Sequence, residues 1–438
     1  MVLGAGADVP LGFPTVADLG RSLTSFANGD GAEIDAALRL RLKNLRFHLG
    51  MVVGDAGEEL VRRLFEDPQS LGASLRSIRS KMGDAEARGP VGEVLDQLCD
   101  MADKNETSPE LARRLGAMVG REVQAGERGL LLDPRRLALD PVVREVIRST
   151  FEQVLLTGVL SSQEREFVGA VVAATSNIEE LLATLFLGFA AQGLLAEKKK
   201  YLYLVWLLWA YIRVRSIECV QSGRESVCQV IANLGVPVIT FNYTDFFYQA
   251  GRDRVCHFHG SHRAYLKLDE RIEVDNDKYL LGADSVSAIA RVIRDRLRLD
   301  VTAADALDVP AIVPPLSFKP VMSPDRLRAW SRADSMIQRA RSIVIIGYSF
   351  SQVDAHFNAL LRGAPDDASI VTVNPDVIGT TGRLLRALGI EAEEQPLSSD
   401  EAPSEIAVGR VRGIKASAEQ LGPKELEELL RSGTLLTT

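Results

Sequence analysis

Residues 236–245 read VPVITFNYTD, and residues 254–262 read RVCHFHGSH. The first run opens with a short apolar segment that is rich in β-branched residues and follows a glycine, which is typical of a buried strand. Asn242 comes directly after this segment. The second run contains a shorter strand candidate, and His259 follows its end. Because ligands bind outside the carboxyl ends of the strands in an open α/β sheet, we expect Asn242 and His259 on one functional rim.

Other strand candidates also end on residues that suit a binding rim. They are residues 1–3 before Gly4-Ala5-Gly6, residues 342–346 before Gly347-Tyr348-Ser349, and residues 370–373 before Asn374. Residues 342–346 are apolar and β-branched after their opening serine, which is the profile of a central parallel strand. Glycine lets a backbone approach a pyrophosphate closely, and a following helix N-terminus favours an anion. The segment from Gly4 onward is therefore interpreted as a phosphate loop.

Helical patterns fill most of the chain between the first and second strand candidates. In residues 176–191, for example, the apolar positions share one helix face. We therefore predict an α/β fold, a Rossmann-like parallel sheet with a large all-helical insertion between the first and second core strands. The predicted domains are a discontinuous core of residues 1–27 and 230–395, the insertion of residues 28–229, and a C-terminal tail of residues 396–438 with a short helix.

Local patterns give finer predictions for the second half of the chain. Residues 279–284 predict the end of a strand, and residues 287–297 and 325–339 predict helices. Residues 311–318 predict an extended or loop segment, and residues 395–412 are polar and loop-like. Residues 1–3 are a short first strand for a dinucleotide-binding fold.

Charge and cysteine content exclude several classes of protein. The net charge of −8 argues against a broad surface for nucleic acid or a membrane. The cysteines form no C-x-x-C pair, so the spacing of a structural zinc site is missing. We expect buried thiols in a reducing cytoplasm. No signal-peptide pattern follows Met1.

The most apolar run in the chain spans residues 201–212 and contains Trp206 and Trp209. A run of about 10–14 apolar residues is too short to cross a bilayer as a helix and is more often a core helix. It also carries too many large apolar residues for a free surface. We therefore expect it to be buried in the core or between subunits.

Taken together, the strand ends resemble the sirtuin-like NAD-consuming family. The motifs that carry this resemblance are Gly4-Ala5-Gly6, Thr240-x-Asn242, His259-Gly260, Gly347-x-Ser349 and Val373-Asn374. Three variants look more like the bacterial anti-phage branch, which includes sirtuin-like defence NADases and AbiH-type abortive-infection proteins: Phe241-Asn242-Tyr243-Thr244, Leu281-Gly282-x-Asp284 and Gly347-Tyr348-Ser349. The resemblance covers residues 1 to about 30 and about 230 to 395.

The resemblance implies an NAD⁺ glycohydrolase that cleaves the nicotinamide–ribose bond and acts in abortive infection by depleting NAD⁺. It implies that His259 is the general base and that Asn242 orients the water and the nicotinamide ribose. It also implies a set of NAD-binding residues: Gly4, Ala5 and Gly6 in the loop after the first strand, Thr240 on the second strand, Asp284 as a brace for the loop near His259, Gly347 and Ser349 for the phosphates or adenine ribose, and Asn374 for the adenine ribose.

Two departures separate this chain from sirtuin deacylases. Those enzymes usually carry a four-cysteine zinc module, which this chain lacks, so no metal is expected. Asp8 stands where sirtuins usually have serine, and a carboxylate near phosphates is unfavourable unless it points away. AbiH-type proteins tend to carry aspartate at this position.

Several residues have simpler interpretations. His257, His259 and His262 could form a metal cluster, although no carboxylate or cysteine has matching spacing. Asn242 could cap a turn. Asp245 and Asp354 are interpreted as helix caps. Ser349 lacks the surrounding G-x-S-x-G elbow of a hydrolase nucleophile.

Other functions stay open at this point. The chain could be a protein deacylase, a non-catalytic sensor of NAD or ADP-ribose, an effector subunit that needs an ATPase or Argonaute-like partner, or a nucleic-acid-acting AbiH-type protein. A homo-oligomer and a phage-derived trigger are expected for the defence hypothesis, and direct contact with nucleic acid or membrane is not.

Overall fold

The computed structural model describes residues 1–45, 68–82, 195–223, 227–247, 254–275, 278–302, 306–313, 323–350, 354–390 and 404–432, with isolated positions between 47 and 189. Contacts divide the chain into two compact units, residues 1–46 with 182–438 and residues 47–181. In the second unit, helix α4 spans Pro68–Lys81. The site lies in the first unit.

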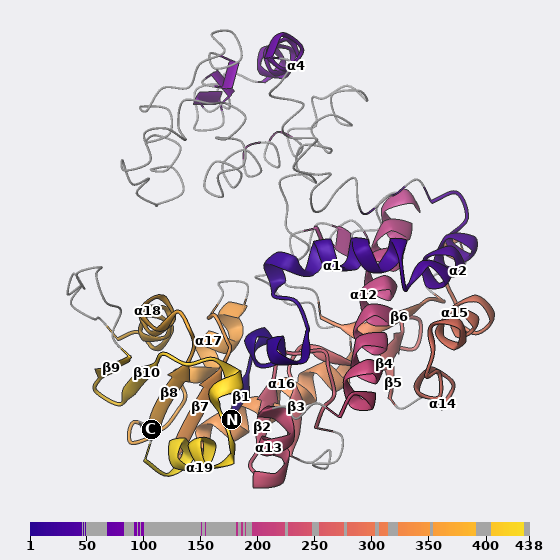
Figure 1. The fold of residues 1–438 in the computed structure, drawn as a ribbon. Coiled ribbons are helices and arrows are strands. Elements are labelled where there is room, and N and C mark those ends of the chain that lie inside the picture. Colours follow the sequence, from indigo (N-terminus) through magenta and orange to yellow (C-terminus); the bar gives the residue numbers. More distant parts are fainter. Residues whose placement is uncertain are drawn as a thin grey trace. The chain divides into compact units, whose positions relative to one another are not determined.

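A seven-stranded sheet forms the centre of the first unit, with the strand order β3-β2-β1-β7-β8-β10-β9 (Figure 1). The strands are β1 (Val2–Leu3), β2 (Val238–Thr240), β3 (Val255–His257), β7 (Ser342–Ile346), β8 (Ser369–Val373), β9 (Glu405–Val408) and β10 (Val411–Ile414). All neighbours pair in parallel except β9 and β10. The prediction of an α/β fold with a parallel sheet is confirmed.

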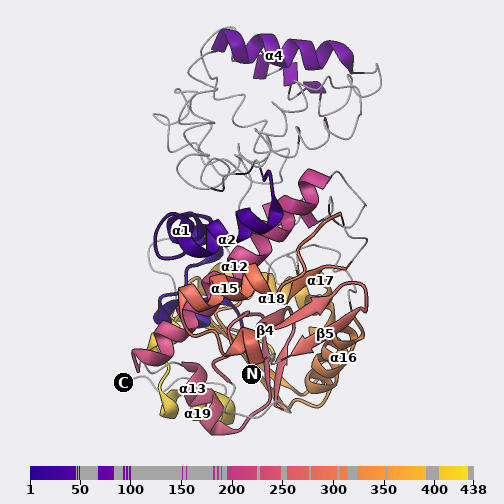
Figure 2. The same cartoon turned by 90° about the vertical axis from the view of Figure 1, so that its right-hand side faces the viewer.

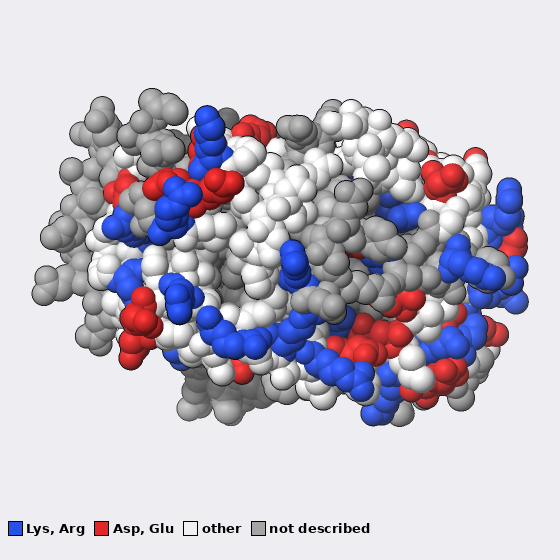
Figure 3. All heavy atoms as spheres, turned by 90° about the horizontal axis from the view of Figure 1, so that it is seen from below, with Lys and Arg blue, Asp and Glu red and all other residues white. Residues whose placement is uncertain are grey.

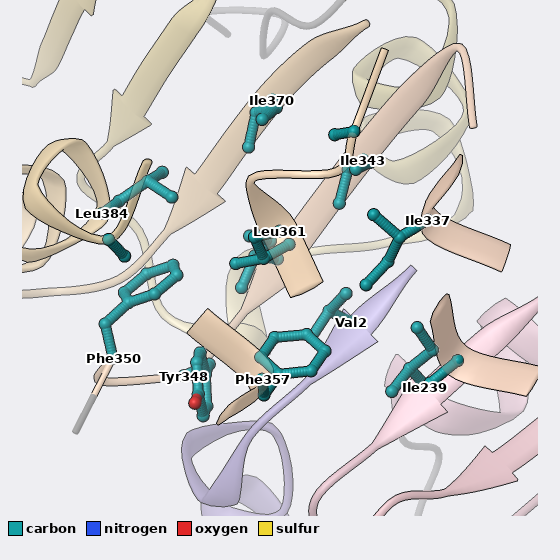
Figure 4. Close-up of a cluster of buried hydrophobic side chains, with 14 of the residues drawn as sticks. Val2, Ile239, Ile337, Ile343, Tyr348, Phe350, Phe357, Leu361, Ile370 and Leu384 are labelled. Carbon is teal, nitrogen blue, oxygen red and sulfur yellow. The ribbon is translucent and has the colours of Figure 1, made fainter. Parts of the chain in front are cut away.

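Alternating side chains bury the two faces of this sheet against different helices. One face carries Val2, Ile239 and Ile343 and packs on α16 (Pro324–Gln338), α17 (Ala355–Leu361) and α18 (Val377–Leu388). Figure 4 shows the ring of Phe357, which is fully buried, beside Val2. The other face packs on α13 (Val227–Leu234) and α19 (Pro423–Ser432). The strands are apolar on both faces because both are covered.

A second, antiparallel sheet has the order β5-β4-β6 and consists of β4 (Gly260–Lys267), β5 (Ile272–Asp275) and β6 (Asp308–Ile312). Helix α12 (Leu195–Gln221) packs against β6 and β4 (Figure 2). Trp206 Nε1 donates to the Asp308 carbonyl at 3.0 Å, and Trp209 Nε1 donates to the His262 carbonyl at 2.7 Å. The predicted burial of residues 201–212 in the core is confirmed.

Further helices surround α12 and this small sheet. They are α1 (Val16–Asn28), α2 (Ala32–Leu42), α14 (Lys278–Leu281) and α15 (Val286–Asp295). The Ser285 hydroxyl caps α15 and the Ser323 hydroxyl caps α16, each through a hydrogen bond from a first-turn amide. The predicted helices at 287–297 and 325–339 are therefore confirmed within two residues or so at each end.

Two local predictions are wrong. Residues 278–281 form the short helix α14 rather than the end of a strand, because an apolar run this short has no distinguishable period. Residues 405–408 and 411–414 are strands of the main sheet rather than loop. β10 is stabilised by pairing with β8, a partner far away in the sequence, and β9 is a partly exposed edge strand. The polar composition of this segment therefore gave no recognisable strand pattern for β9 or β10.

The described elements between residues 28 and 229 are helices. The rest of this segment lies outside the described residues, including most of the patterns at 58–66, 141–156 and 176–191, so the all-helical insertion stays a prediction. The compact second unit begins at residue 47 and ends at residue 181, because α2 and α12 pack within the first unit. The second unit, residues 47–181, is therefore shorter than the predicted insertion of residues 28–229.

Surface charge and membrane hydropathy complete the description. On the face in Figure 3, Lys and Arg side chains form a short row beside a group of Asp and Glu, so both signs share this face. Among the helices that the structure describes, none combines the length and apolar character needed to cross a membrane.

Candidate active site

The carboxyl ends of β1, β2, β3, β7 and β8 lie on one rim, since these strands are parallel. The chain proceeds from β1 to β2 and β3 on one side, and β7 and β8 lie on the other. The boundary between β1 and β7 is thus the topological switch point, where open α/β sheets bind their ligands. Gly4 follows β1 and Gly347 follows β7, so both lie at this point.

Backbone contact between the loops explains these glycines. The Gly4 amide donates to the Ile346 carbonyl at 2.9 Å, and the Gly6 amide donates to the Gly347 carbonyl at 3.0 Å. A Cβ on Gly4 would lie 2.5 Å from the Gly347 carbonyl oxygen. Gly347 has φ +63°, and its Cβ would lie 2.5 Å from the amide nitrogen of Ala7. The glycines therefore make the two loops one tightly packed unit, with Ala5 exposed at its surface.

His259 is held two residues beyond β3. Its carbonyl accepts the Val313 amide at 2.8 Å. The next residue, Gly260, has φ +87°, and a Cβ there would lie 1.6 Å from the Ala311 carbonyl oxygen. No side chain fits at position 260, so this glycine lets the chain turn closely against Ala311 directly after His259. His259 is 7% exposed.

Asp354 is the partner of His259. Its Oδ1 lies 3.1 Å from His259 Nε2. Asp354 occupies the N-cap position of α17, but within the described chain its carboxylate makes no capping hydrogen bond. The interpretation as a cap is therefore wrong for the side chain. Sequence reasoning missed this residue because its position before a helix gave a sufficient local explanation.

Tyr348 completes a three-residue chain. Its hydroxyl donates to Asp354 Oδ2 at 3.2 Å. Burial, together with the negative charge of Asp354, raises the pKa of Tyr348, so the phenol stays protonated and remains a donor. Asp354 thus accepts from Tyr348 on one oxygen and faces His259 with the other.

Aromatic rings fix the orientation of the His259 imidazole. The Phe241 ring meets it edge-on, with centroids 4.9 Å apart and planes at 88°. Tyr348 stacks on Phe241 at 4.4 Å. Trp330 Nε1 donates to the carbonyl of Phe258, the residue before His259, at 3.0 Å. The rings of Phe241 and Tyr348 therefore form an apolar wall beside the His259–Asp354 pair.

Asn242 lies on the neighbouring strand end. Its backbone amide donates to Thr240 Oγ1 at 3.1 Å, and both residues are buried. The Phe258 amide donates to the Thr240 carbonyl at 2.9 Å, which joins the β2 and β3 ends. The structure therefore places Asn242 and His259 at neighbouring strand ends on one rim, as predicted. The buried Thr240 side chain accepts the hydrogen bond that holds the turn at Asn242.

The other predicted residues divide into two groups. Ser349 is exposed and its carbonyl accepts Arg383 Nε at 2.7 Å. Asn374 is half-buried, and its Oδ1 accepts the Asp376 amide at 2.9 Å. Both lie on the β7–β8 side, where Arg383, which sequence reasoning missed, adds a partly exposed guanidinium. Asp284 is exposed between α14 and α15, and its charge acts on Arg213 of α12.

His257 belongs to a separate cluster. Its Nε2 lies 3.6 Å from Asp245, which also pairs with Arg263 at 2.9 Å. Burial alone would raise the pKa of Asp245, but the hydrogen bond and charge of His257 and the charge of Arg263 outweigh it and lower the pKa. Asp245 is therefore an ion-pair partner rather than a helix cap. These residues line a cavity of about 300 Å³ beside β3.

The three histidines face three different partners. His262 Nδ1 lies 3.0 Å from the Tyr243 carbonyl oxygen, and burial lowers the pKa of His262 to about 4, so it is neutral. His257 faces Asp245 and His259 faces Asp354. Among the residues that the structure describes, no three His, Cys, Asp or Glu side chains are grouped to hold a metal ion.

Comparisons with known proteins give distant structural matches alone. No protein-family model and no curated protein matches the chain. A crystal structure of a Sir2 homologue with NAD is 18% identical and aligns 54% of this chain with 73% of that one, at a TM-score of 0.31. A mutant Sir2 homologue with ADP-ribose is 20% identical, over 52% and 72%, at a TM-score of 0.30. Another mutant, with 2′-O-acetyl ADP-ribose, is 20% identical, over 54% and 75%, at 0.31. At these low values, neither the fold nor the function of this chain is inferred from the matches.

Proposed function

We propose that the protein is an NAD⁺ glycohydrolase that cleaves the nicotinamide–ribose bond. The observation that carries this proposal is the His259–Asp354 pair, buried at a rim that also contains the switch point of the sheet. A buried imidazole with a carboxylate behind it is suited to general-base catalysis. The neighbouring glycine loops offer a backbone surface of the kind that a dinucleotide approaches closely.

The chemistry of the bond requires few catalytic groups. Nicotinamide leaves the ribose as a neutral base, so no general acid is needed. Water then attacks an oxocarbenium-like carbon and must lose a proton. Asp354 faces Nε2 of His259 and favours the tautomer with its proton there, so Nδ1 accepts the proton from water. Asp354 stabilises the imidazolium that results, and Asn242 orients the water and the ribose.

The remaining residues have proposed binding roles. Gly4, Ala5, Gly6 and Gly347 would form the backbone surface under the pyrophosphate. Because the Gly4 and Gly6 amides are already bonded, these glycines would contribute close approach rather than donors. Thr240 supports the Asn242 turn. Ser349 and Asn374 would contact the adenosine half, with Arg383 as a nearby positive charge, and Asp284 would brace a loop.

The biological role is the defence role that the sequence resemblance implies. The protein would deplete NAD⁺ in the cytoplasm during phage infection, as a homo-oligomer or with an ATPase or Argonaute-like partner, after a phage-derived trigger. Residues 1–27 and 230–395 would form the catalytic domain, with the helical insertion available for control. A deacylase is less favoured, because sirtuin deacylases usually bind zinc through four cysteines. In the part of the chain that the structure describes, the thiols of Cys219, Cys228 and Cys256 each face a different oxygen acceptor.

Release of nicotinamide from NAD⁺ tests the proposal. Purified protein, and cells that express it before and after phage infection, should convert NAD⁺ to nicotinamide and ADP-ribose, and His259→Ala should not. An active preparation in which His259→Ala retains full activity would overturn the assignment. The low exposure of His259 and Asp354, 7% and 6%, also favours a second candidate, a non-catalytic sensor. A sensor would bind ADP-ribose by calorimetry and release no nicotinamide under either condition.

A further inference from the structure

The end of β8 is surrounded by residues from three other elements. Asn374 directly follows β8, and its backbone amide donates to the Ile414 carbonyl at the end of β10 at 3.0 Å. Arg383 of α18 reaches the same place, because its Nε donates to the Ser349 carbonyl in the loop after β7 at 2.7 Å. Ser349, Asn374, Arg383 and the end of β10 therefore form one group, which we call the β8 corner.

The carboxylate of Asp376 lies at the β8 corner, but both of its oxygens are engaged within the protein. Oδ1 accepts the Gly379 amide at 2.9 Å, so Asp376 caps α18, and Oδ2 accepts from Nη2 of Arg383 at 3.1 Å. Dinucleotide-binding folds that take NAD commonly place an acidic side chain on the 2′-hydroxyl of the adenine ribose. Asp376 is instead held by its own helix and by an arginine that neutralises its charge.

The β8 corner offers hydrogen-bond donors to a ligand. Asn374 Oδ1 accepts the Asp376 amide at 2.9 Å, which leaves the NH₂ end of the asparagine side chain. The Arg383 side chain is 37% exposed and uses its Nε and Nη2 atoms within the protein. Its Nη1 makes no hydrogen bond to any of the described residues. An arginine nitrogen can only donate, so this group suits an acceptor-rich ligand.

Lys415 adds a second positive charge. It directly follows β10, whose end lies on the same rim as that of β8 because the two strands are parallel. Lys415 is exposed and forms no ion pair with the described part of the chain. The carboxylate of Glu405, on the neighbouring strand β9, pairs with Arg412 at 3.7 Å instead. The two positive charges of Arg383 and Lys415 therefore exceed the single negative charge of Asp376.

We propose that the β8 corner binds a phosphate on the 2′-oxygen of the adenine ribose, so that the protein cleaves NADP⁺ at least as well as NAD⁺. This inference rests on the proposed function and names a further substrate for the same site. A phosphate presents acceptor oxygens and negative charge, which match the donors and the positive charge at this corner. An arginine near the ribose is also the means by which dinucleotide-binding folds accommodate a 2′-phosphate.

The reaction itself is unchanged by the extra phosphate. Water adds to the ribose carbon that carries nicotinamide, and its proton goes to His259. The carbon–nitrogen bond breaks, and its electron pair leaves with neutral nicotinamide. The 2′-phosphate is not transferred, so the second product is 2′-phospho-ADP-ribose.

Substrate preference in wild type and in Arg383→Gln tests the proposal. Wild-type protein should show a kcat/KM for NADP⁺ that equals or exceeds the value for NAD⁺. Glutamine can still donate to the Ser349 carbonyl but carries no charge. Arg383→Gln should therefore lower the ratio of the two kcat/KM values, NADP⁺ over NAD⁺, about 10- to 100-fold, the equivalent of one charged hydrogen bond. A wild-type preference for NAD⁺, or a ratio that Arg383→Gln leaves unchanged, would overturn the proposal.

Two further variants show whether the charge acts at this place. Arg386→Gln is the matched control, because it removes the same charge from an exposed position of α18 three residues further from the rim. It should change the ratio less than about two-fold, as for a distant, screened charge. Arg383→Lys restores the charge and should restore most of the preference. Both substrates are measured on one preparation, so the ratio does not depend on the fraction of protein that folds.

A binding measurement does not depend on activity. Adenosine 2′,5′-bisphosphate should bind the full chain about ten-fold more tightly than AMP by calorimetry, and Arg383→Gln should remove this difference. Adenosine 3′,5′-bisphosphate has the same charge in a different place and should gain less. If the 2′-phosphate is preferred but no preparation releases nicotinamide, the proposed function fails and the phosphate site stands. If nicotinamide is released from NAD⁺ and the adenosine phosphates all bind equally, the proposed function stands and this inference fails.

Discussion

His259 and Asp354 come from opposite sides of the switch point, and their nearest atoms, Nε2 and Oδ1, are 3.1 Å apart. Both side chains are less than one-tenth exposed. Two segments that are far apart in the sequence therefore bring an imidazole and a carboxylate together in the interior, and this pair is the proposed source of the base.

Asp354→Asn should reduce kcat for nicotinamide release by about 10²- to 10⁴-fold, because the amide cannot stabilise an imidazolium. The KM for NAD⁺ should change little, since Asp354 lies behind the base. The control is Tyr348→Phe, which removes a hydrogen bond to Asp354 worth about 1 kcal/mol and should cost less than about 10-fold. Steady-state kinetics in which Tyr348→Phe is as impaired as Asp354→Asn would contradict this assignment.

The two histidines near the end of β3 should behave differently on substitution. His259→Ala should remove most NAD⁺ hydrolysis, about 10²- to 10⁴-fold, and Asn242→Ala should cost a similar amount. Their double mutant should be little worse than either, because both act on one water. His257→Ala should retain substantial activity, since His257 faces Asp245. Inactive His257→Ala together with active His259→Ala would show that the wrong histidine was chosen.

Asn374→Ala should act on binding rather than on the chemical step. Asn374 lies on the β7–β8 side of the switch point, where the adenosine half of NAD⁺ is proposed to bind, so its loss should raise the KM for NAD⁺ about 3- to 10-fold, the equivalent of one hydrogen bond. Its Oδ1 also accepts the Asp376 amide, so thermal unfolding must be measured beside the kinetics. A fall in kcat with an unchanged KM would remove Asn374 from the binding site.

Asp8→Asn should change how stability depends on pH, since the Asp8 carboxyl is buried. Because the pKa of Asp8 is raised from 3.8 to about 6, the folded state binds this proton more tightly than the unfolded state does. The stability that results is present below the unfolded pKa and is lost as the pH rises through 6. Relative to wild type, Asp8→Asn should therefore gain about 2 kcal/mol in free energy of unfolding between about pH 4.5 and pH 8. Urea titrations with parallel pH profiles for both proteins would refute the burial effect.

Two glycines allow a matched test of the close contact between the β1 and β7 loops. Gly347 and Gly389 both have positive φ, but a Cβ on Gly389 would meet open space, whereas one on Gly347 would clash with Ala7. Gly389→Ala should cost about 1–2 kcal/mol from the left-handed backbone alone. Gly347→Ala should cost clearly more and should reduce NAD⁺ affinity. Equal denaturation midpoints for the two variants would show that the loops can separate freely.

The main sheet could be predicted from sequence because its strands are apolar on both faces and end on distinctive residues. Val2, Ile239 and Ile343 bury such strands on helices whose own patterns are strong. β9 and β10 could not be predicted, since β10 is stabilised by pairing with the distant strand β8, and β9 pairs with β10. α14 was missed because a short apolar run fits either secondary structure.

The part of the site that could be predicted consists of polar residues that directly follow recognisable strands. Asn242 and His259 lie on one rim because parallel strands end together. Asp354 was missed because its partner is distant in sequence and its local position suggested a cap. Asp8 was interpreted only as a departure from a motif, since burial against Thr244 depends on tertiary packing.

The hydrogen bond from Trp330 to the carbonyl before His259 gives the protein an optical reporter. The chain has three tryptophans, and Trp206 and Trp209 are sealed within α12 at 0% and 1% exposure, where their emission should form a constant background. Trp330 also packs against His356, with ring centroids 5.2 Å apart. Changes in the emission of unlabelled protein should therefore report rearrangements of the backbone that carries His259, in real time and in variants that turn over no substrate.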